Sequence, residues 1–212
     1  MRTPQVNIAL QKTLTKQRLE KYLAVSNNDL DTALKLYEEN IRLSESFYTP
    51  LQCVEICLRN VLHAQLTAAF GTDWYQNGGP NFTADSQSMI GDAFASLVNK
   101  PLPLDPNDVV AELKFAFWVG LLGPHYDATL WRHCLHKVFL ARGGRPRKTV
   151  HGRLNTIRRF RNRVMHHEPI FNRPLQQLHD EIIEAISWMC RDTAAWTTYR
   201  SRYDEVAASQ GN

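Results

Sequence analysis

Residues 149–169 read TVHGRLNTIRRFRNRVMHHEP, with an apolar residue at every third or fourth position until a proline ends the pattern. This spacing predicts an amphipathic helix from Thr149, as its N-cap, to about His167. On a helical wheel the apolar residues form one stripe: Val150, Leu154, Ile157, Phe160 and Val164. The stripe is the side of the helix that we expect to face the core.

The opposite side of this helix is polar and is expected to face solvent, RNA or a second protomer. It carries Asn155, Arg159, Asn162, Arg163 and His166. Arg161 does not join them, because it lies at the edge of the apolar stripe, where an unpaired guanidinium is costly. Arg161 therefore needs a carboxylate, a backbone carbonyl or a phosphate as its partner.

Helical patterns outnumber strand patterns in the rest of the chain. Caps such as Asp29, Asp108 and Asp127, and breaks rich in Gly and Pro, separate the predicted helices. These helices cover residues 10–23, 28–43, 49–71, 85–98, 108–119, 127–139, 174–191 and 193–206. The sequence thus predicts an all-α fold.

Length and composition are those of an ordinary globular protein. The chain has 212 residues, 43% of them hydrophobic, and a formal net charge of +4, which fits one sizeable core. Four cysteines lack the spacing of a disulfide framework, so a reducing compartment is expected. No stretch resembles a signal peptide or approaches the roughly 20 apolar residues that span a bilayer. We expect a cytoplasmic protein without a membrane partner.

Positive charge is concentrated in one part of the sequence. Residues 142–163 contain nine Lys or Arg and no Asp or Glu, which indicates a polyanionic partner. The candidate RNA-binding residues are Arg142, Arg145, Arg147, Lys148, Arg159 and Arg163. A charge run of this kind can also be a solvated surface. Trp74 and Tyr75, beside a Gly-rich loop, are the better candidates for surface aromatics, whereas Trp118, Trp131 and Trp188 have the spacing of core residues.

Charged residues also occur on predicted apolar faces. Glu55 and Arg59 lie among the leucines of the 49–71 helix, and Glu112 lies among apolar neighbours in the 108–119 helix. One polar network shared with Arg161 would explain all four charges. The alternative for Glu55 and Arg59 is a simple i,i+4 ion pair at the margin of the core.

Four segments, taken in order, carry a resemblance to a known family. They are EICLRN at 55–60, AELKFAFW at 111–118, LWR at 130–132 and IRRFRNRVMHHEPIF at 157–171. Through them the chain, from roughly Tyr37 to Trp188, resembles the Abi-like (abortive infection) proteins of the HEPN superfamily, all-α ribonucleases and RNA-binding domains of prokaryotic conflict systems. The resemblance implies a HEPN-like helical bundle over residues 37–190. Residues 1–36 would be an N-terminal helical extension, and residues 191–212 a C-terminal helix and tail.

The resemblance also implies an activity. Arg161 and His166 match the family's Arg-x4-His pair, with Asn162 as the polar residue after the arginine. The histidine would assist attack of a ribose 2′-OH on the adjacent phosphate while the arginine stabilises the transition state. Such a metal-independent endoribonuclease needs no cofactor. It would act as the toxin or effector of an abortive-infection or toxin–antitoxin system, with an RNA or protein antitoxin as a possible partner.

Arg161 and His166 lie about 140° apart on an ideal helix, so they do not converge. The helix can distort, the arginine can curl round, or two copies of the chain can share the site. Since HEPN relatives commonly dimerise through this helix, we expect a homodimer with a composite active site. His167 is the alternative catalytic base, and Glu168 can orient a histidine.

Two other interpretations remain open. Cys53 and Cys57 share a helix face and His133, Cys134 and His136 form a cluster, so zinc has to be considered, although the spacing matches no zinc framework. A non-catalytic HEPN protein that holds a structured RNA on the same basic face is the alternative function.

Overall fold

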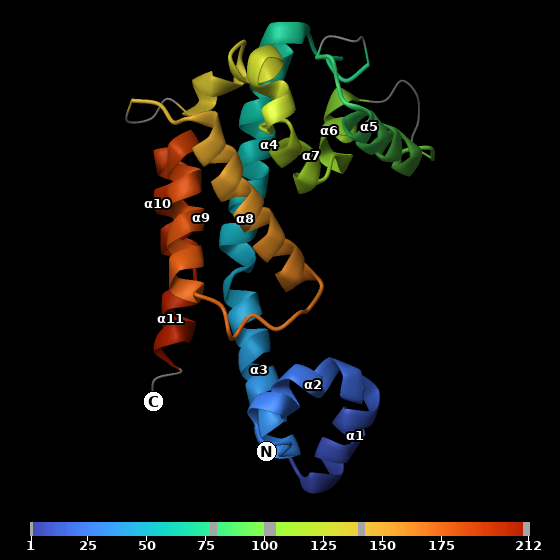
Figure 1. The fold of residues 1–212 in the computed structure, drawn as a ribbon, viewed down its shortest axis with the longest axis vertical. Coiled ribbons are helices and arrows are strands. Elements are labelled where there is room, and N and C mark those ends of the chain that lie inside the picture. Colours follow the sequence, from blue (N-terminus) through green and yellow to red (C-terminus); the bar gives the residue numbers. More distant parts are fainter. Residues whose placement is uncertain (1, 77–79, 100–104, 140–142, 210–212) are drawn as a thin grey trace.

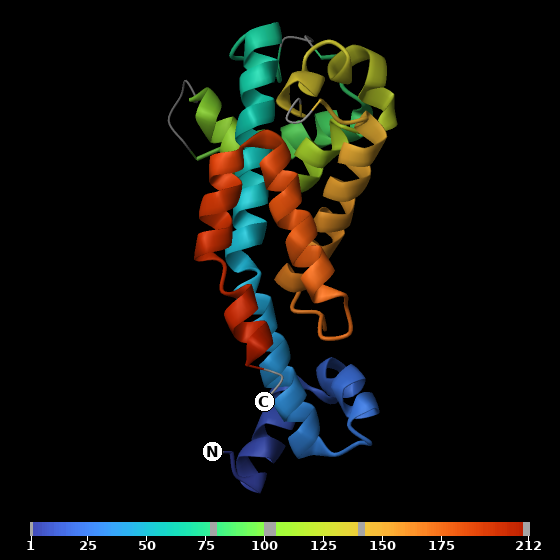
Figure 2. The same ribbon diagram turned by 90° about the vertical axis from the view of Figure 1, so that its left-hand side faces the viewer.

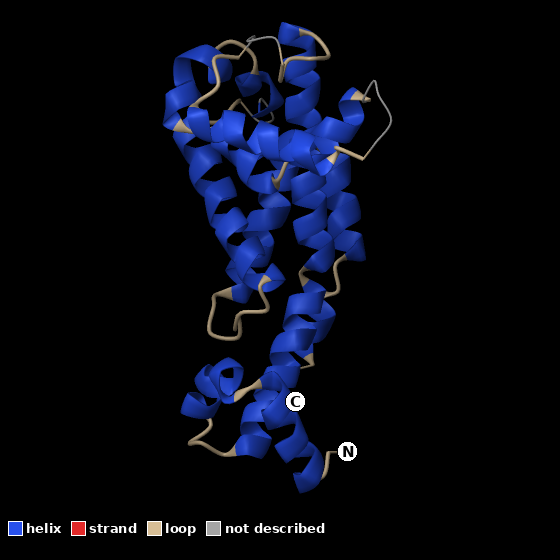
Figure 3. Cartoon of the chain, turned by 90° about the vertical axis from the view of Figure 1, so that its right-hand side faces the viewer, coloured by secondary structure: helices blue, strands red, loops and turns tan. Residues whose placement is uncertain are grey.

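The computed structural model describes residues 2–76, 80–99, 105–139 and 143–209. Within these residues the regular structure is entirely helical, with no strand (Figure 3), which confirms the predicted all-α class. The α-helices are α1 (Pro4–Leu14), α2 (Lys16–Val25), α3 (Leu30–Ser46), α4 (Tyr48–Phe70), α5 (Ala84–Ser96), α6 (Pro106–Glu112), α7 (Phe115–Gly120), α8 (Arg147–Met165), α9 (Leu175–Met189), α10 (Arg191–Arg200) and α11 (Tyr203–Ala208).

Helices α3 and α4 form a long central rod that is interrupted only at Phe47 (Figure 1). Helices α7, α9 and α10 pack against α4, and α8 packs against α7 and α9 (Figure 2). The buried face of α4 carries an apolar residue at about every turn, and these residues are fully buried: Leu51, Val54, Leu58, Leu62 and Leu66. This periodic burial is what places α4 in the middle of the bundle.

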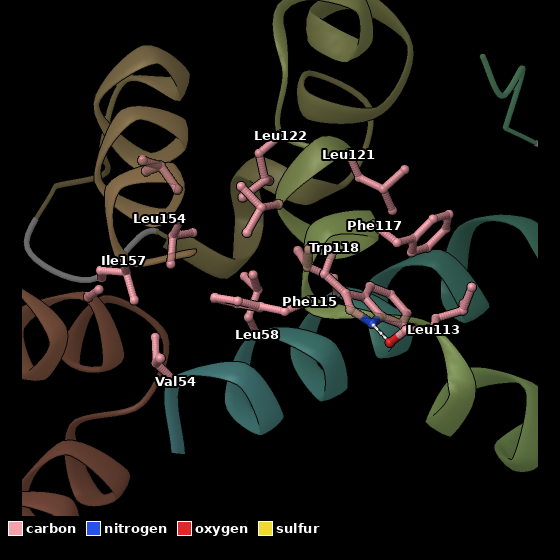
Figure 4. Close-up of a cluster of buried hydrophobic side chains, with 14 of the residues drawn as sticks. Val54, Leu58, Leu113, Phe115, Phe117, Trp118, Leu121, Leu122, Leu154 and Ile157 are labelled. Atoms are coloured by element: carbon pink, nitrogen blue, oxygen red, sulfur yellow. Dashed lines mark hydrogen bonds between the residues drawn. The ribbon is translucent and has the colours of Figure 1, made fainter. Parts of the chain in front are cut away.

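The predicted apolar stripe of α8 is confirmed. The buried residues of this helix are the five expected from the wheel: Val150, Leu154, Ile157, Phe160 and Val164. Leu154 and Ile157 point toward Val54 and Leu58 of α4 and toward Trp118 of α7 (Figure 4). One face of α8 is thereby fixed, and its other face is left for polar residues.

The N-terminal helices have a hydrophobic cluster of their own. Its buried members are Leu19, Tyr22, Leu23, Ala33 and Leu34. Helix α3 carries residues of both clusters, so the predicted boundary between residues 36 and 37 falls inside one helix. At the other end of the chain, Ala194 of α10 and Tyr203 of α11 belong to the main core.

Two predicted helices are each divided in the structure. The helix expected over residues 10–23 is α1 and α2, because Thr15 has a φ of 69° and its hydroxyl accepts the Arg18 N–H as the N-cap of α2. The helix expected over 108–119 is α6 and α7. They are separated by extended backbone at Leu113, whose carbonyl accepts the indole N–H of buried Trp118 at 3.1 Å.

Two further predicted helices are also broken. Residues 127–139 form the short turns η2 (Asp127–Trp131) and η3 (Leu135–Phe139) rather than an α-helix, and a further short turn, η1 (Pro124–Tyr126), precedes them. The Asp127 carboxylate binds two arginines and caps no helix. The helix predicted over 193–206 is interrupted at Ser201, which separates α10 from α11.

No helix of the described part of the chain combines the length and the apolar character that crossing a membrane requires.

Candidate functional site

The candidate site lies at the C-terminal end of α8, where the chain reverses. His166 is the C-cap, the His167 N–H donates to the Val164 carbonyl at 3.0 Å, and the Glu168 N–H donates to the Arg163 carbonyl at 2.9 Å. These two bonds form a Schellman motif. His167 occupies its left-handed position with a φ of 55°, where glycine is the usual residue. The two histidines therefore leave the helix in different directions.

Arg161 finds its partner across the bundle, on α4. Its Nε donates to Glu55 Oε2 at 3.1 Å, and the two side chains are 31% and 26% exposed. In the described part of the structure the terminal nitrogens of Arg161 make no further hydrogen bond. This confirms that the arginine at the edge of the stripe is paired with a carboxylate, and it leaves two N–H₂ groups for a phosphate.

The predicted network of four charges is wrong. Arg59 is partly exposed and its Nε donates to Asn60 Oδ1 at 3.2 Å, so it does not pair with Glu55. Glu112 is exposed at the last position of α6. The break at Leu113 changes the direction of the chain there, so the apolar neighbours expected on a continuous helix no longer surround Glu112. Of Glu55, Arg59 and Glu112, only Glu55 forms an ion pair with Arg161.

The side chain of His166 is exposed and makes no hydrogen bond or ion pair within the described residues. Asn162 is partly exposed. Arg161 and His166 are not in contact in the single chain, in agreement with their separation of about 140° on the wheel. One copy of the chain thus presents an anchored arginine and a free imidazole near the same helix end without joining them.

The loop after the motif is held by residues that sequence reasoning did not single out. Asn40 of α3 is 3% exposed, and its Oδ1 accepts the backbone N–H of Ile170 at 2.7 Å and that of Phe171 at 3.3 Å. From α2, Arg18 donates to the carbonyls of His166 at 3.4 Å and His167 at 3.0 Å. No local pattern marks either residue, because each bond joins segments more than 100 residues apart.

Removing the Asn40 acceptor is expected to destabilise the loop. In Asn40→Ala the buried Ile170 N–H is left without a partner, which costs about 1–3 kcal/mol in the free energy of unfolding. Urea unfolding followed by circular dichroism measures this loss. Glu39→Ala, an exposed neighbour on the same helix, is the matched control and should stay within about 0.5 kcal/mol of wild type. Equal stability of the two variants would contradict the assignment.

The predicted RNA-binding residues fall into distinct groups. Lys148 and Arg159 are exposed and lie on α8. Arg147 was predicted to bind RNA, but its side chain is only 16% exposed. It pairs with Asp127 at 2.8 Å and donates to the Leu122 carbonyl at 2.8 Å. Its role is therefore structural.

The other candidate RNA-binding residues are partly buried or lie outside the described residues. Arg163 pairs with Glu168 at 3.1 Å and is 27% exposed. Arg145 is partly buried, with its guanidinium carbon 4.9 Å from the centre of the Trp188 ring. Arg142 lies outside the described residues.

The expected surface aromatics are buried. Trp74 is completely inaccessible and Tyr75 is 7% exposed. The indole N–H of Trp74 donates to His63 Nδ1 at 3.1 Å, which satisfies its polar atom inside the core. Trp118, Trp131 and Trp188 are buried as predicted.

Cys53, Cys57 and Cys190 line one apolar groove of about 490 Å³ between α4 and α10. Within the described residues, no three His, Cys, Asp or Glu side chains are arranged to hold a metal ion.

The cysteine thiols differ in acidity. Hydrogen bonds from Thr193 lower the pKa of Cys190, the N-cap of α10, whereas burial raises the pKa of Cys57 to about 11 and also raises that of Cys134.

These thiols should react at different rates. Because the thiolate is the nucleophile, iodoacetamide at pH 8 is expected to alkylate Cys190 at least about tenfold faster than Cys57 or Cys134. Peptide mass spectrometry of the native protein over time measures the three rates. In denaturant the rates should become similar, and native labelling of Cys57 as fast as Cys190 would show the prediction to be wrong.

Comparison of the chain with protein-family models, with curated proteins and with solved structures found no match.

Proposed function

We propose that the chain is a metal-independent endoribonuclease of the HEPN type, with Arg161 and His166 as its catalytic residues and Asn162 beside them. The observation that carries this proposal is the pairing of Arg161 with Glu55, which holds one nitrogen at 3.1 Å from the carboxylate and leaves the terminal N–H₂ groups free. The exposed imidazole of His166 follows at the end of the same helix. These are a phosphate-binding group and a proton-transfer group.

The proposed reaction breaks the RNA backbone by transesterification. His166 takes the proton of a ribose 2′-OH, whose oxygen attacks the adjacent phosphorus, and Arg161 stabilises the negative charge of the crowded transition state. The P–O5′ bond breaks and the leaving oxygen takes up a proton. The products carry a 2′,3′-cyclic phosphate and a 5′-OH. Because the nucleophile is the ribose 2′-OH and the histidine takes its proton, the step needs no metal-activated water.

A homodimer would bring the two groups together. Since Arg161 is held toward α4 and His166 faces outward, the arginine of one protomer and the histidine of another can meet if the polar faces of two α8 helices lie opposite each other. Exposed Lys148 and Arg159 extend this face for RNA. Sedimentation velocity of the active protein tests the dimer, because full activity of a monomer would exclude a composite site.

We place this activity in the cytoplasm, in an abortive-infection or toxin–antitoxin system of the kind in which the Abi-like HEPN proteins act. Its toxicity would be restrained by an RNA or protein antitoxin. The alternative is a non-catalytic HEPN protein that binds a structured RNA. The separation of Arg161 from His166 within one chain favours this alternative if no dimer forms.

One experiment separates the two functions. Purified protein is incubated with RNA in EDTA, and the product ends are identified by mass spectrometry. Cleavage with 2′,3′-cyclic phosphate ends is expected, with DNA and 2′-O-methyl RNA resistant. His166→Ala should slow cleavage by about 100- to 10 000-fold, whereas His167→Ala should slow it less than about tenfold. Tight binding without cleavage by the wild type would leave the RNA-binding alternative.

A further inference from the structure

A pocket lies at the opposite end of α8 from the candidate site. It has a volume of about 370 Å³ and is lined by Trp131, Arg132, His136, Gly144 and Arg145. Trp131 ends η2, Arg132 follows it, His136 belongs to η3, and the segment that leads into α8 supplies the two remaining residues. In Figure 1 this is the end of the molecule where the yellow turns meet the start of α8.

The charge around this pocket is positive. Asp127 is shared between Arg132 at 2.9 Å and Arg147 at 2.8 Å, and on the Trp188 side Glu181 and Glu184 are paired with Arg153. At Asp127 one carboxylate therefore faces two guanidiniums. From residue 128 to residue 167 the sequence contains no Asp or Glu, so no acidic side chain of this segment balances Arg145. An anion is the ligand that such an excess of charge favours.

Arg145 is held against an aromatic ring. Its guanidinium lies 4.9 Å from the centre of the Trp188 ring, and its Nε is buried without a hydrogen-bond partner. Stacking on an aromatic ring fixes the plane of an arginine and reduces the entropy that binding must overcome. A buried donor without a partner is uncommon in folded proteins and calls for an acceptor.

His136 adds a second directed group. Its Nδ1 lies 3.0 Å from the carbonyl oxygen of Trp131. A carbonyl can only accept, so Nδ1 carries a hydrogen, and Nε2 is the ring nitrogen that this bond does not use.

We propose that this pocket binds a phosphate group of RNA, with Arg145 and Arg132 as the charged contacts and His136 beside them. The inference rests on the proposed RNA substrate. Helix α8 has 19 residues, so along the helix axis its start lies about 21 Å from Arg161 and about 28 Å from His166. A stacked strand covers the longer distance in about eight nucleotides. The pocket would thus hold the substrate at a phosphate remote from the cleaved bond.

The test measures binding rather than cleavage. Fluorescence anisotropy with a labelled 16-nucleotide RNA is measured in a His166→Ala background at several salt concentrations. Arg145→Ala is expected to weaken binding about tenfold and to lower the salt slope by about 1. Arg132→Ala should weaken binding several-fold, and it cannot be dismissed as unfolded, because Arg132 is 75% exposed and Asp127 keeps Arg147. Arg191→Ala, an exposed arginine on α10, should have no effect.

Two outcomes would overturn the proposal. If neither Arg145→Ala nor Arg132→Ala changes RNA affinity relative to Arg191→Ala, the pocket does not contact RNA. If calorimetry shows that inorganic phosphate or pyrophosphate binds in an Arg145-dependent way while RNA affinity is unchanged, the pocket serves a small phosphate ligand instead. Failure of the wild type to cleave RNA would overturn the ribonuclease but not the pocket, because the binding measurement does not depend on cleavage.

Discussion

Replacing Arg161 by alanine in the proposed ribonuclease is expected to lower kcat/KM for RNA cleavage by about 100- to 1000-fold, the usual cost of removing one preorganised charge from a transition state. The loss should not follow from unfolding. Arg161 and Glu55 are 31% and 26% exposed, and an ion pair this accessible contributes about 1 kcal/mol or less to stability. The thermal midpoint of the variant should therefore stay close to that of wild type.

The partner of the arginine gives the sharper test. Glu55→Gln keeps an oxygen for the Arg161 Nε but removes the charge that holds the guanidinium, so a smaller loss of about tenfold is expected. If Glu55 acts only through Arg161, the double variant should be no less active than Arg161→Ala alone. Initial rates with a quenched fluorescent RNA measure all three variants.

A second arginine of α8 supplies the control. Arg153 pairs with Glu184 at 2.7 Å and with Glu181 at 3.7 Å, so it too is an arginine of this helix that bridges to a neighbouring helix. Arg153→Ala should retain activity within about threefold of wild type. Full activity of Arg161→Ala, or equal losses in the Arg153 and Arg161 variants, would exclude a catalytic role for Arg161.

The sequence predicted those parts of the fold that depend on local periodicity. The buried stripe of α8 follows from residues within one helix, and the Asp29 cap of α3 follows from adjacent residues, with Asp29 Oδ2 accepting the Thr32 N–H at 2.8 Å. The breaks inside four of the predicted helices were not predicted. The turn at Leu113 depends on an indole that bonds its carbonyl inside the core, and periodicity carries no information about such a contact.

In the candidate site, too, local periodicity predicted some features and missed those that depend on contacts between distant segments. The wheel placed Arg161 at the margin of the core, where it needed a carboxylate, a backbone carbonyl or a phosphate, and the structure identifies the partner as Glu55, 106 residues earlier in the chain. Arg147 was predicted to bind RNA as part of a basic segment. The structure ties it to Asp127, a partner 20 residues away that the sequence suggested as a helix cap. Pairing between distant segments is the information that one sequence lacks.

Phe47→Ala is expected to lower the free energy of unfolding by about 3–5 kcal/mol. Phe47 is fully buried between α3 and α4, and its ring meets Phe160 of α8 edge-on, with the centroids 4.8 Å apart. It also contacts Tyr203 of α11, with the centroids 4.9 Å apart. One side chain thus joins the central rod to α8 and to the last helix, so its loss leaves a cavity that no single element can close.

The adjacent residue separates this packing effect from any effect on helix continuity. Tyr48→Ala removes an aromatic ring that is 57% exposed, so it should change stability by no more than about 0.5 kcal/mol. Phe47→Leu refills most of the cavity but loses the edge-to-face contacts, which contribute about 0.5–1.5 kcal/mol per pair beyond buried area. Urea unfolding of the three variants should therefore rank Phe47→Ala below Phe47→Leu and both below Tyr48→Ala. If the Phe47 and Tyr48 variants were equally stable, Phe47 would not be the packing link between the rod and α8. The position of Arg161, the residue that follows Phe160, would then depend on its ion pair with Glu55 rather than on this contact.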